Sequence, residues 1–443
     1  MKEIVNVGIV GFGTVGSGTA KILLEQGQLL QARTSTQISL KWICDMDITT
    51  DRGFEVPKDI LTTDINSLLD DPELDILVEL IGGIEPARTF ILKAIEKGKH
   101  VVTANKALLA THGFEIFEAA SRKGVEVGFE ASVGGGIPCI KALKEGLVAN
   151  NVNTVLGIMN GTANYILTRM TQEGLAFDAV LKQAQDLGYA EADPTYDIEG
   201  IDTAHKLAIM STLAFGQKIG LSDIYTEGIS KITPLDISFA TELGYSIKLL
   251  AIGKKNSDQQ VDVRIHPTMI PKDHLLSQVN GAYNAVYFVG DSVGKVMLYG
   301  MGAGQMPTGS AIVADIVDIS RDIVRGCPGR VPALSLPFES IKEPSIKPVE
   351  SVSCKYYFRF SVKDKPGVLS RIAGILGKEE ISIHSVVQKG RAHETSSVPI
   401  VMLTHEATEG KVKKALKEID SQDFILDETM IIRIEDMKAL EES

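Results

Sequence analysis

An aspartate and a lysine stand four residues apart near the middle of the chain, as Asp202 and Lys206 within LGYAEADPTYDIEGIDTAHKLAIM, residues 187–210. In a helix this spacing puts both side chains on one face, where Ile209 and Leu213 continue an apolar stripe. A lysine held beside carboxylates in a partly dry pocket can be tuned as an acid or a base. The pair therefore suits a proton-transfer site, although spacing alone fits an ordinary helix salt bridge better.

A glycine-rich turn follows the first apolar run of the chain. Residues 4–10 alternate as a short strand and lead directly into GFGTVG. Gly11 permits a tight turn, Gly13 lets backbone approach a pyrophosphate, and Gly16 lets a helix over residues 17–30 pack close. The amino terminus of that helix then faces the phosphates. The predicted dinucleotide-binding residues of this turn are Gly11, Phe12, Gly13, Thr14, Val15 and Gly16.

Strands and helices must alternate beyond this turn to position the chemistry. We expect strands over residues 38–44, 75–81, 100–103 and 125–130, with helices such as residues 86–97 between them. This order predicts an α/β fold with a Rossmann-type, doubly wound parallel sheet. Gly82 and Gly83 follow one strand, and Asn105 and Lys106 follow the next, at the sheet edge where such folds bind ligands.

The second strand should end at the group that meets the adenosine ribose. Asp45 stands there and favours the free ribose hydroxyls of NAD, although a simple turn residue is the alternative. Arg52 in the same loop could instead reach the ribose phosphate of NADP. The sequence thus discriminates poorly between the two cofactors, with a weak preference for NAD or dual use.

Two polar segments with glycines come next, EASVGGGIP over residues 130–138 and NGTANYIL over residues 160–167. The glycine carbonyls could share a small cation with Glu130, or the glycines could form an interdomain hinge. Thr162, Asn160 and Asn164 could bind a polar substrate, but capping of the following helix is the stronger expectation.

A third glycine cluster, GMGAGQMPTG over residues 300–309, precedes an apolar helix expected over residues 310–325. We expect this loop to close a ligand pocket and its helix to return to the nucleotide-binding domain, with Gly304 near the cofactor. A plain helix entry explains the loop equally well.

Composition sets limits that are consistent with a soluble enzyme. The 443 residues suggest about three domains, and 44% hydrophobic residues can fill substantial cores. The net charge of −12, without a lysine or arginine block, disfavours nucleic acid and anionic membranes as partners. Lys2 and Glu3 lead straight into the first strand, so we expect no signal peptide and a cytoplasmic location.

The four cysteines lie far apart, without the pairing typical of zinc or redox motifs. One of them, Cys139, leaves an alternative open, because a nucleophilic cysteine would make an NAD-binding chain an aldehyde-oxidising enzyme. No histidine motif offers itself as the activating base. His205, beside Lys206, is expected to be a packing residue.

The carboxyl-terminal part of the chain comes after a proline-punctuated linker. Strands are expected over residues 355–362, 381–388, 398–404 and 429–434, with helices over residues 368–378 and 408–419. This βαββαβ order is the ferredoxin-like arrangement. Its first turn reads DKPGVL, and free amides at the following helix start can hold a carboxylate.

The chain resembles the homoserine dehydrogenases, because six segments occur in the order seen in that family: GFGTVG, TANKALLA, EASVGGGIP, NGTANYIL, LGYAEADPTYDIEGIDTAHKLAIM and GMGAGQMPTGSAIVADI. The carboxyl-terminal part, with its DKPGVL turn, resembles an ACT regulatory domain, as in the longer bacterial form. The resemblance implies reversible NAD(P)-dependent interconversion of L-aspartate 4-semialdehyde and L-homoserine, in threonine, methionine and isoleucine biosynthesis.

The resemblance also implies roles for individual residues. Lys206 is similar to the proton donor, Asp202 to the residue that orients it, and Lys106 to the second active-site lysine. The implied substrate-binding residues are Glu191, Asp197, Thr162 and Tyr189. A monovalent cation, usually sodium, maps to Glu130 and the backbone oxygens of Val133, Gly135 and Ile137. Family members often carry a basic residue where this chain has Cys44, which puts a preference for NADP in doubt.

The resemblance divides the chain into a nucleotide-binding domain (1–135), a substrate-binding, catalytic and dimerisation domain (136–309), a returning helix (310–335), a linker (336–352) and an ACT domain (353–443). An amino-acid effector, with threonine expected, would bind at Asp364, Pro366, Gly367, Val368, Ile383 and Ser385. We expect a homodimer or homotetramer with the effector between subunits. The alternatives are an ACT domain that only dimerises, and a non-catalytic amino-acid sensor on a cofactor-binding scaffold.

Overall fold

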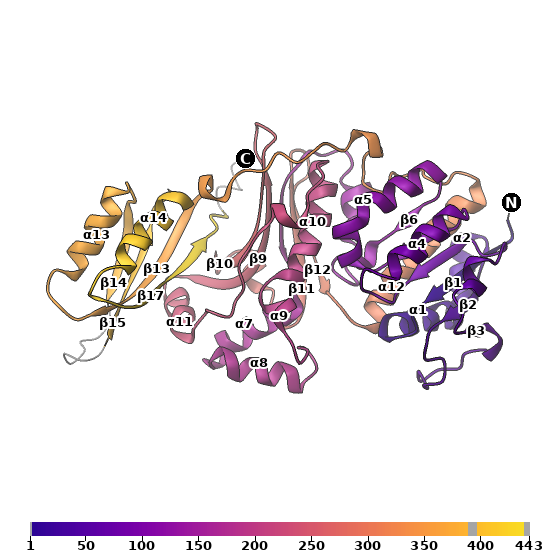
Figure 1. Ribbon diagram of the computed structural model, residues 1–443, viewed down its shortest axis with the longest axis horizontal. Coiled ribbons are helices and arrows are strands. Elements are labelled where there is room, and N and C mark those ends of the chain that lie inside the picture. Colours follow the sequence, from indigo (N-terminus) through magenta and orange to yellow (C-terminus); the bar gives the residue numbers. More distant parts are fainter. Residues whose placement is uncertain (1, 389–396, 438–443) are drawn as a thin grey trace. The chain divides into compact units, whose positions relative to one another are not determined.

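The computed structural model describes residues 2–388 and 397–437 (Figure 1). The chain divides into two compact units. Unit 1 comprises Met1–Gly161, Asp202–Ile224 and Ala282–Pro344, and unit 2 comprises Thr162–Ile201, Tyr225–Gly281 and Ser345–Ser443. Each unit is therefore assembled from segments far apart in sequence, and the finer division into five domains stays a prediction.

Unit 1 contains a six-stranded sheet with the order β3-β2-β1-β4-β5-β6, in which all neighbours are parallel. This order confirms the doubly wound parallel sheet. Its strands are β1 (Ile4–Val10), β2 (Gln37–Cys44), β3 (Leu61–Thr62), β4 (Ile76–Glu79), β5 (His100–Thr103) and β6 (Val127–Gly128). The strand order reverses between β1 and β4, and ligands of doubly wound sheets bind at the carboxyl ends of the two strands that flank such a reversal.

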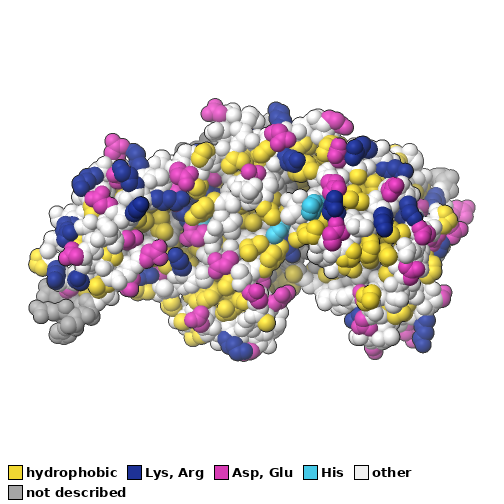
Figure 2. Space-filling view, in the orientation of Figure 1, with side chains coloured by type: hydrophobic (Ala, Val, Ile, Leu, Met, Phe, Trp, Pro, Cys, Tyr) yellow, Lys and Arg dark blue, Asp and Glu magenta, His cyan; other side chains and the backbone are white. Residues whose placement is uncertain are grey.

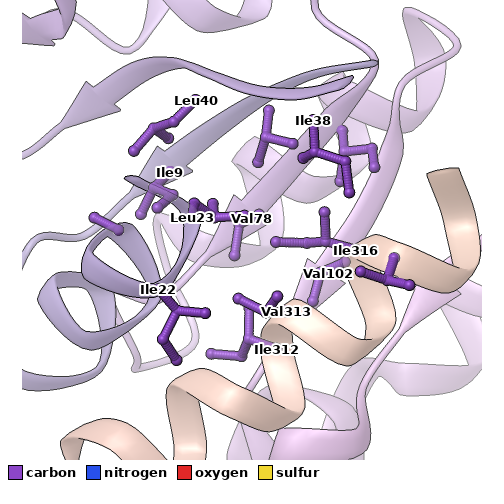
Figure 3. Packing of buried hydrophobic residues seen from close by; sticks show 14 of the residues in the cluster. Ile9, Ile22, Leu23, Ile38, Leu40, Val78, Val102, Ile312, Val313 and Ile316 are labelled. Carbon is purple, nitrogen blue, oxygen red and sulfur yellow. The ribbon is translucent and has the colours of Figure 1, made fainter. Parts of the chain in front are cut away.

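Helices pack on this sheet through their apolar faces. They are α1 (Thr14–Glu25), α2 (Gly27–Thr34), α3 (Asn66–Leu69), α4 (Ala87–Glu96), α5 (Lys106–Lys123) and α12 (Gln305–Arg325). Figure 3 shows Ile22 of α1 and Ile312 of α12 packed among Ile9, Val78 and other buried side chains. Burial of such a cluster is the main driving force for folding unit 1.

Glycines let α12 lie directly against α1. A Cβ on Gly18 would stand 2.4 Å from the carbonyl oxygen of Gln305, and one on Gly309 would stand 2.9 Å from the carbonyl carbon of Gly18. The expected start of this helix at residue 310 was wrong. The helix begins at Gln305. Pro307 is tolerated there because it lies in the first helical turn, and the close packing of α12 on α1 requires a glycine at position 309.

Two other expected elements differ in extent. The helix expected over residues 17–30 is two helices, since the chain breaks at Gln26 between α1 and α2. The strand expected to reach residue 130 ends at Gly128, and Glu130–Ser132 forms a 3₁₀ turn. The cause lies in Asp315, whose Oδ2 accepts a hydrogen bond from the backbone N–H of Glu130 at 2.8 Å.

Unit 1 also contains an antiparallel ladder in which β11 (Tyr283–Gly290) pairs with β7 (Val152–Ile158) and with β12 (Gly294–Met301). The short helix α6 (Cys139–Lys141) precedes β7. Most of α10 (Ile201–Phe215) belongs to this unit and is almost wholly buried. Helix α10 carries Asp202 and Lys206, and Asn160 lies in the segment that follows β7.

Unit 2 is built on a mixed sheet with the order β9-β10-β17-β13-β15-β14. The strands are β8 (Tyr225–Thr226), β9 (Tyr245–Lys255), β10 (Val261–Pro271), β13 (Ser353–Lys363), β14 (Ile383–Gln388), β15 (Ser397–Thr404), β16 (Ala407–Thr408) and β17 (Ile425–Ile434). Strand β10 pairs parallel with β17, so the carboxyl-terminal module extends the sheet of the preceding segment.

The helices of unit 2 are α7 (Gly161–Glu173), α8 (Phe177–Asp186), α9 (Thr195–Ile198), α11 (Pro234–Glu242), α13 (Val368–Lys378) and α14 (Glu409–Asp420). The carboxyl-terminal elements confirm the predicted βαββαβ order. Helices α13 and α14 cover a core that includes Phe358, Phe360 and Ile372.

Acidic and basic side chains are interspersed over the face shown in Figure 2. Throughout the described ranges, no helix combines the length and the apolar character that crossing a bilayer requires.

Candidate active site

The predicted nucleotide turn has the geometry that its glycines suggested. Gly11 has a φ of +102°, and a Cβ there would stand 2.6 Å from the backbone that follows β4. A Cβ on Gly16 would stand 1.9 Å from the carbonyl oxygen of Gly11, so α1 packs directly on the turn. By contrast, Gly13 faces open space, and Thr14 and Val15 begin α1 without a side-chain cap. The exposed amides fit a pyrophosphate.

The carboxylate of Asp45 lies against this turn. It accepts hydrogen bonds from the backbone N–H groups of Phe12 and, at 2.8 Å, of Asp47. The guanidinium of Arg52 lies 5.3 Å from the ring centroid of Phe12 and 3.3 Å from a carboxylate oxygen of Asp47. A carboxylate can accept further hydrogen bonds, so Asp45 is still able to bind ribose hydroxyls. Arg52 is in the same loop and is the competing determinant.

Gly304 precedes α12 with a φ of +124°. The next residue, Gln305, donates from its side chain to the hydroxyl of Ser17 on α1 at 2.9 Å. The start of α12 therefore lies beside the first helix of the nucleotide turn.

A buried network at the ends of β4 and β5 holds the turn that carries Lys106. Glu79 accepts from the hydroxyl of Thr103 at 2.7 Å and from the N–H of Ile81 at 2.9 Å. Asn105 caps α5 by accepting from the N–H of Leu108 at 3.1 Å. Burial raises the pKa of the Glu79 carboxyl. These contacts fix the first residue of α5, which is Lys106.

Lys206, Asp202 and Lys106 come together in unit 1. Lys206 Nζ donates to Asp202 Oδ2 and to the carbonyl oxygen of Met159, both at 2.6 Å. Lys106 Nζ lies 3.1 Å from Asp202 Oδ1, and Asn160 Nδ2 donates to Asp202 Oδ2 at 2.9 Å. The cluster is more than a helix salt bridge, because it joins α10, α5 and the segment after β7.

Electrostatics keep this carboxyl ionised. Burial alone would raise the pKa of Asp202, but the charges of Lys206 and Lys106, with hydrogen bonds from Lys206 and Asn160, hold it at about 2. The side chain of Lys206 is 10% exposed and that of Lys106 is 32% exposed. One anion between two cations leaves a net positive charge, which suits an oxygen that develops negative charge.

The four residues expected to bind substrate belong to unit 2. Thr162 donates its hydroxyl hydrogen to the carbonyl oxygen of Tyr189 at 2.7 Å, and the ring of Tyr189 stacks on Tyr165 with centroids 4.8 Å apart. Glu191 is exposed between α8 and α9, and Asp197 is half-buried in α9. The structure thus joins Thr162 to Tyr189.

Glu130 lies at the start of α6, where its two carboxylate oxygens accept from the N–H groups of Ile140 and Lys141 at 2.8 Å. The carbonyl oxygens of Val133 and Ile137 both accept from Cys139, from its thiol and from its N–H respectively. Gly134 and Gly135 take positive φ values of 72° and 55° to form this turn.

The carboxylate of Glu130 and the carbonyl oxygens of Val133 and Ile137 thus all bind residues of α6. Burial, together with the charge of Asp315, raises the pKa of Glu130 to about 7. A cation would offset this cost by favouring the ionised carboxylate.

The nucleophilic alternative for Cys139 was wrong. The thiol is fully buried, and burial and the charge of Glu130 raise its pKa. A catalytic thiol requires an accessible sulfur and a lowered pKa.

The chain matches the families described as "Homoserine dehydrogenase, NAD binding domain" over residues 11–130, "Homoserine dehydrogenase" over residues 138–317 and "ACT domain" over residues 356–423. It is 45% identical to the homoserine dehydrogenase of Neisseria gonorrhoeae and 44% identical to that of Pseudomonas aeruginosa. Each alignment covers 98% of this chain and 99% of the relative. The chain belongs to the homoserine dehydrogenase family.

Solved structures agree with this assignment. A homoserine dehydrogenase from Thiobacillus denitrificans is 46% identical and superposes with a TM-score of 0.91, over 98% of this chain and 99% of that one. A hyperthermophilic archaeal homoserine dehydrogenase in complex with NADPH is 26% identical, with a TM-score of 0.60 over 72% of this chain and 98% of that one. The family is one of NAD(P)-dependent oxidoreductases, and the match to its NAD-binding domain begins at Gly11.

The ACT region of this homoserine dehydrogenase carries the expected effector residues around α13. Gly367 precedes the helix with a φ of +91°, Asp364 and Pro366 are exposed, and Val368 is buried. Ile383 and Ser385 are half-buried on β14, the strand at one edge of the sheet in unit 2.

Sequence reasoning missed several residues of this homoserine dehydrogenase site. The carbonyl of Met159 anchors Lys206, and Glu79 and Thr103 anchor the turn of Lys106. Asn160 was considered as a cap or a substrate ligand, but its side chain binds Asp202. A buried glutamate at the end of a parallel strand, as in VEL, was the one signal that could have pointed to Glu79.

Proposed function

We propose that this homoserine dehydrogenase reversibly interconverts L-aspartate 4-semialdehyde and L-homoserine, in the biosynthesis of threonine, methionine and isoleucine. The observation that carries the proposal is the cluster of Lys206, Asp202 and Lys106 in the unit that holds the nucleotide turn. Family membership supports the substrate pair.

Lys206 donates a proton to the carbonyl oxygen during reduction and takes it back during oxidation. Its ammonium group has three N–H donors, of which Asp202 and Met159 receive two, so the third suits a substrate oxygen. The nicotinamide, when bound, supplies or accepts the hydride. Asp202 orients Lys206, and Lys106 adds positive charge beside the oxygen.

The proposed ligands of the amino-acid head group are Glu191, Asp197, Thr162 and Tyr189. A carboxylate such as Glu191 suits the substrate ammonium group, and the Thr162 hydroxyl can accept a further hydrogen bond. Glu191, Asp197 and Tyr189 lie in the most acidic part of their motif, LGYAEADPTYDIEG, and Thr162 lies in NGTANYIL.

An absorbance assay of the reduced nicotinamide tests the function. Homoserine with NAD or NADP should produce reduced cofactor, and aspartate semialdehyde should consume it. A chain that binds cofactor but turns over neither substrate would instead be a non-catalytic sensor. Retention of both lysines and Asp202 in one cluster favours the enzyme.

We also propose a monovalent cation, sodium by preference, at Glu130 with the carbonyl oxygens of Val133, Gly135 and Ile137. The convergence of Glu130, Val133 and Ile137 on the start of α6 supports it. Exhaustive dialysis should lower activity or thermal stability, and sodium or potassium should restore it. If neither ion changes the activity or the thermal stability, the proposal is wrong.

For the ACT region we propose inhibition by an amino acid, with threonine expected, bound at the DKPGVL turn and β14. The exposed turn, at Asp364, Pro366 and Gly367, supports this site. A homodimer or homotetramer would place the effector between copies, and the effector would act by binding the less active state more tightly. Initial rates measured with each aspartate-family amino acid test this inhibition. If none of them changes the rate, the ACT region would have only a role in dimerisation.

A further inference from the structure

Asn284 is a buried asparagine whose side chain is left without hydrogen bonds. It lies on β11, and the residue is only 1% exposed. Neither Nδ2 nor Oδ1 has a hydrogen-bond partner among the residues that the structure describes. An enclosed amide without partners destabilises a fold, so such a group in a native protein calls for a functional explanation.

The amide is enclosed by glycine backbone. A Cβ on Gly302 would stand 2.2 Å from Cγ, 2.3 Å from Nδ2 and 2.4 Å from Oδ1 of Asn284, so the amide plane lies flat against the Cα of Gly302. A Cβ on Gly161 would stand 3.5 Å from Oδ1. The backbone at Gly302 therefore covers one face of the buried amide.

Gly302 belongs to the segment that leads into α12. Asn284 is paired with Gly300 in the β11–β12 ladder, and Gly304 precedes α12 two residues beyond Gly302. A Cβ on Gly135 would stand 2.5 Å from the carbonyl oxygen of Gly302. The segment over residues 300–304 thus lies between Asn284 and the turn proposed to hold the cation.

The same asparagine is close to the proton-transfer cluster. The next residue on β11, Ala285, is paired with Ile158 at the end of β7. The residue after Ile158 is Met159, whose carbonyl oxygen accepts from Lys206 at 2.6 Å. Continuing the antiparallel register by one step places Asn284 opposite Met159.

We propose that Asn284 is a positioning residue for cofactor binding. Residues 300–304 shift when the nicotinamide cofactor binds, and the amide of Asn284 then hydrogen-bonds the backbone of that segment. The unpaired amide disfavours the cofactor-free arrangement and so promotes the bound one. The inference rests on the proposed assignment of Gly304 to the cofactor site.

Replacing Asn284 by leucine tests the proposal, with Asn164→Leu as the matched control. Both asparagines are 1% exposed, but Asn164 donates to the carbonyl oxygens of Val279 and Gly281 and accepts from Lys248. The measurements are the melting temperature without nucleotide, the Kd for NADPH and for NADH by fluorescence titration, and KM against kcat. Asn284→Ala is the second variant.

We expect Asn284→Leu to melt at the wild-type temperature or above it without nucleotide, while Asn164→Leu melts lower. The Kd and the KM for the cofactor should rise at least about fivefold, with kcat changed less than about twofold. A fall in melting temperature like that of Asn164→Leu, or failure of both Asn284 variants to fold, would show a structural amide and overturn the proposal.

An unchanged Kd and KM in a folded Asn284→Leu protein would overturn it as well. Failure of the proposed function is a separate result, because it would appear as a wild-type protein that does not turn over homoserine at all.

Discussion

Lys106 and Lys206 approach opposite oxygens of one carboxylate, since Lys106 lies 3.1 Å from Oδ1 of Asp202 and Lys206 lies 2.6 Å from Oδ2. The two lysines come from different helices, α5 and α10, and meet only through folding. Asp202 therefore sets the distance between Lys206, the proposed proton donor, and a second positive charge, an arrangement that suits the reduction of an aldehyde.

Lys206→Ala should reduce turnover by about 10²–10⁴, the range expected for the loss of a general acid, while the Kd for the cofactor changes little. Steady-state rates with homoserine measure this. Lys182→Ala is the control, because Lys182 forms an exposed pair with Asp186 at the same spacing of four. Near-normal turnover in folded Lys206→Ala protein would disprove the assignment.

Asp202→Asn should lower both turnover and stability. Two lysine charges lose their buried counter-ion, which costs about 3 kcal/mol when such a pair is broken on one side. Because the pKa of Asp202 is lowered to about 2, its stabilisation is present above the ordinary value of 3.8 and lost as pH falls through 2. The free energy of unfolding, measured with denaturant between pH 5 and pH 2, should depend less on pH in the variant than in the wild type.

The buried side chain of Lys248 should make the free energy of unfolding rise at alkaline pH. Its Nζ donates to the carbonyl oxygen of Val279 at 2.6 Å and to Oδ1 of Asn280 at 3.1 Å, and burial lowers its pKa to about 8. Between pH 8 and the ordinary value of 10.5 the unfolded chain binds more protons, so the free energy of unfolding rises with pH, by about 3 kcal/mol in total.

Lys248→Met should remove that rise, as urea unfolding at pH 7.5, 9 and 10 would show. An equal rise in wild type and variant would assign the effect to other groups.

Deletion of residues 351–443 should destabilise the protein rather than merely release it from inhibition. Glu435 of the deleted part accepts hydrogen bonds from Arg264 at 3.3 Å and from Lys254, and β17 pairs with β10. Arg264 is 3% exposed, so the deletion leaves a buried cation short of a partner. Size-exclusion chromatography and melting curves should show aggregation or a lower melting temperature. Asp364→Ala, in the exposed turn, should leave both unchanged.

The cofactor preference should be weak. Asp45 can accept from ribose hydroxyls and would repel a ribose phosphate, so we expect kcat/KM for NAD to equal or exceed that for NADP, or to lie within about tenfold of it. Assays with both cofactors on wild type and Arg52→Ala test this. A strong preference for NADP that disappears in Arg52→Ala would assign the choice to Arg52 instead.

Local patterns predicted most of the elements. The strands Ile4–Val10 and His100–Thr103 and the helix Val368–Lys378 match the expected bounds, because apolar period, glycine turns and flanking charges all act within a few residues. The same signals placed Asp202 and Lys206 on one helix face.

Long-range pairing left no comparable signal. Strands β10 and β17 are typical strands in sequence, and nothing in either indicates that they pair. Asn284 is one asparagine in an ordinary strand, YNAVYFVG, and its missing hydrogen bonds become visible only when Gly302 and Gly161 enclose it. Met159 acts through its carbonyl group, which every residue possesses, so its residue type could not reveal it.

The parallel pairing of β10 with β17 also bears on synthesis. A ribosome completes residues 261–271 long before it reaches residues 425–434, the last strand among the described residues. Until then the backbone groups of Thr268 and Met269 that pair with β17 have no strand partner on that side, whereas β8 is already available to pair with Arg264 and Ile265. Unit 2 therefore completes its sheet only after residues 425–434 have been made, and until then this stretch of β10 is an edge with which other chains can pair.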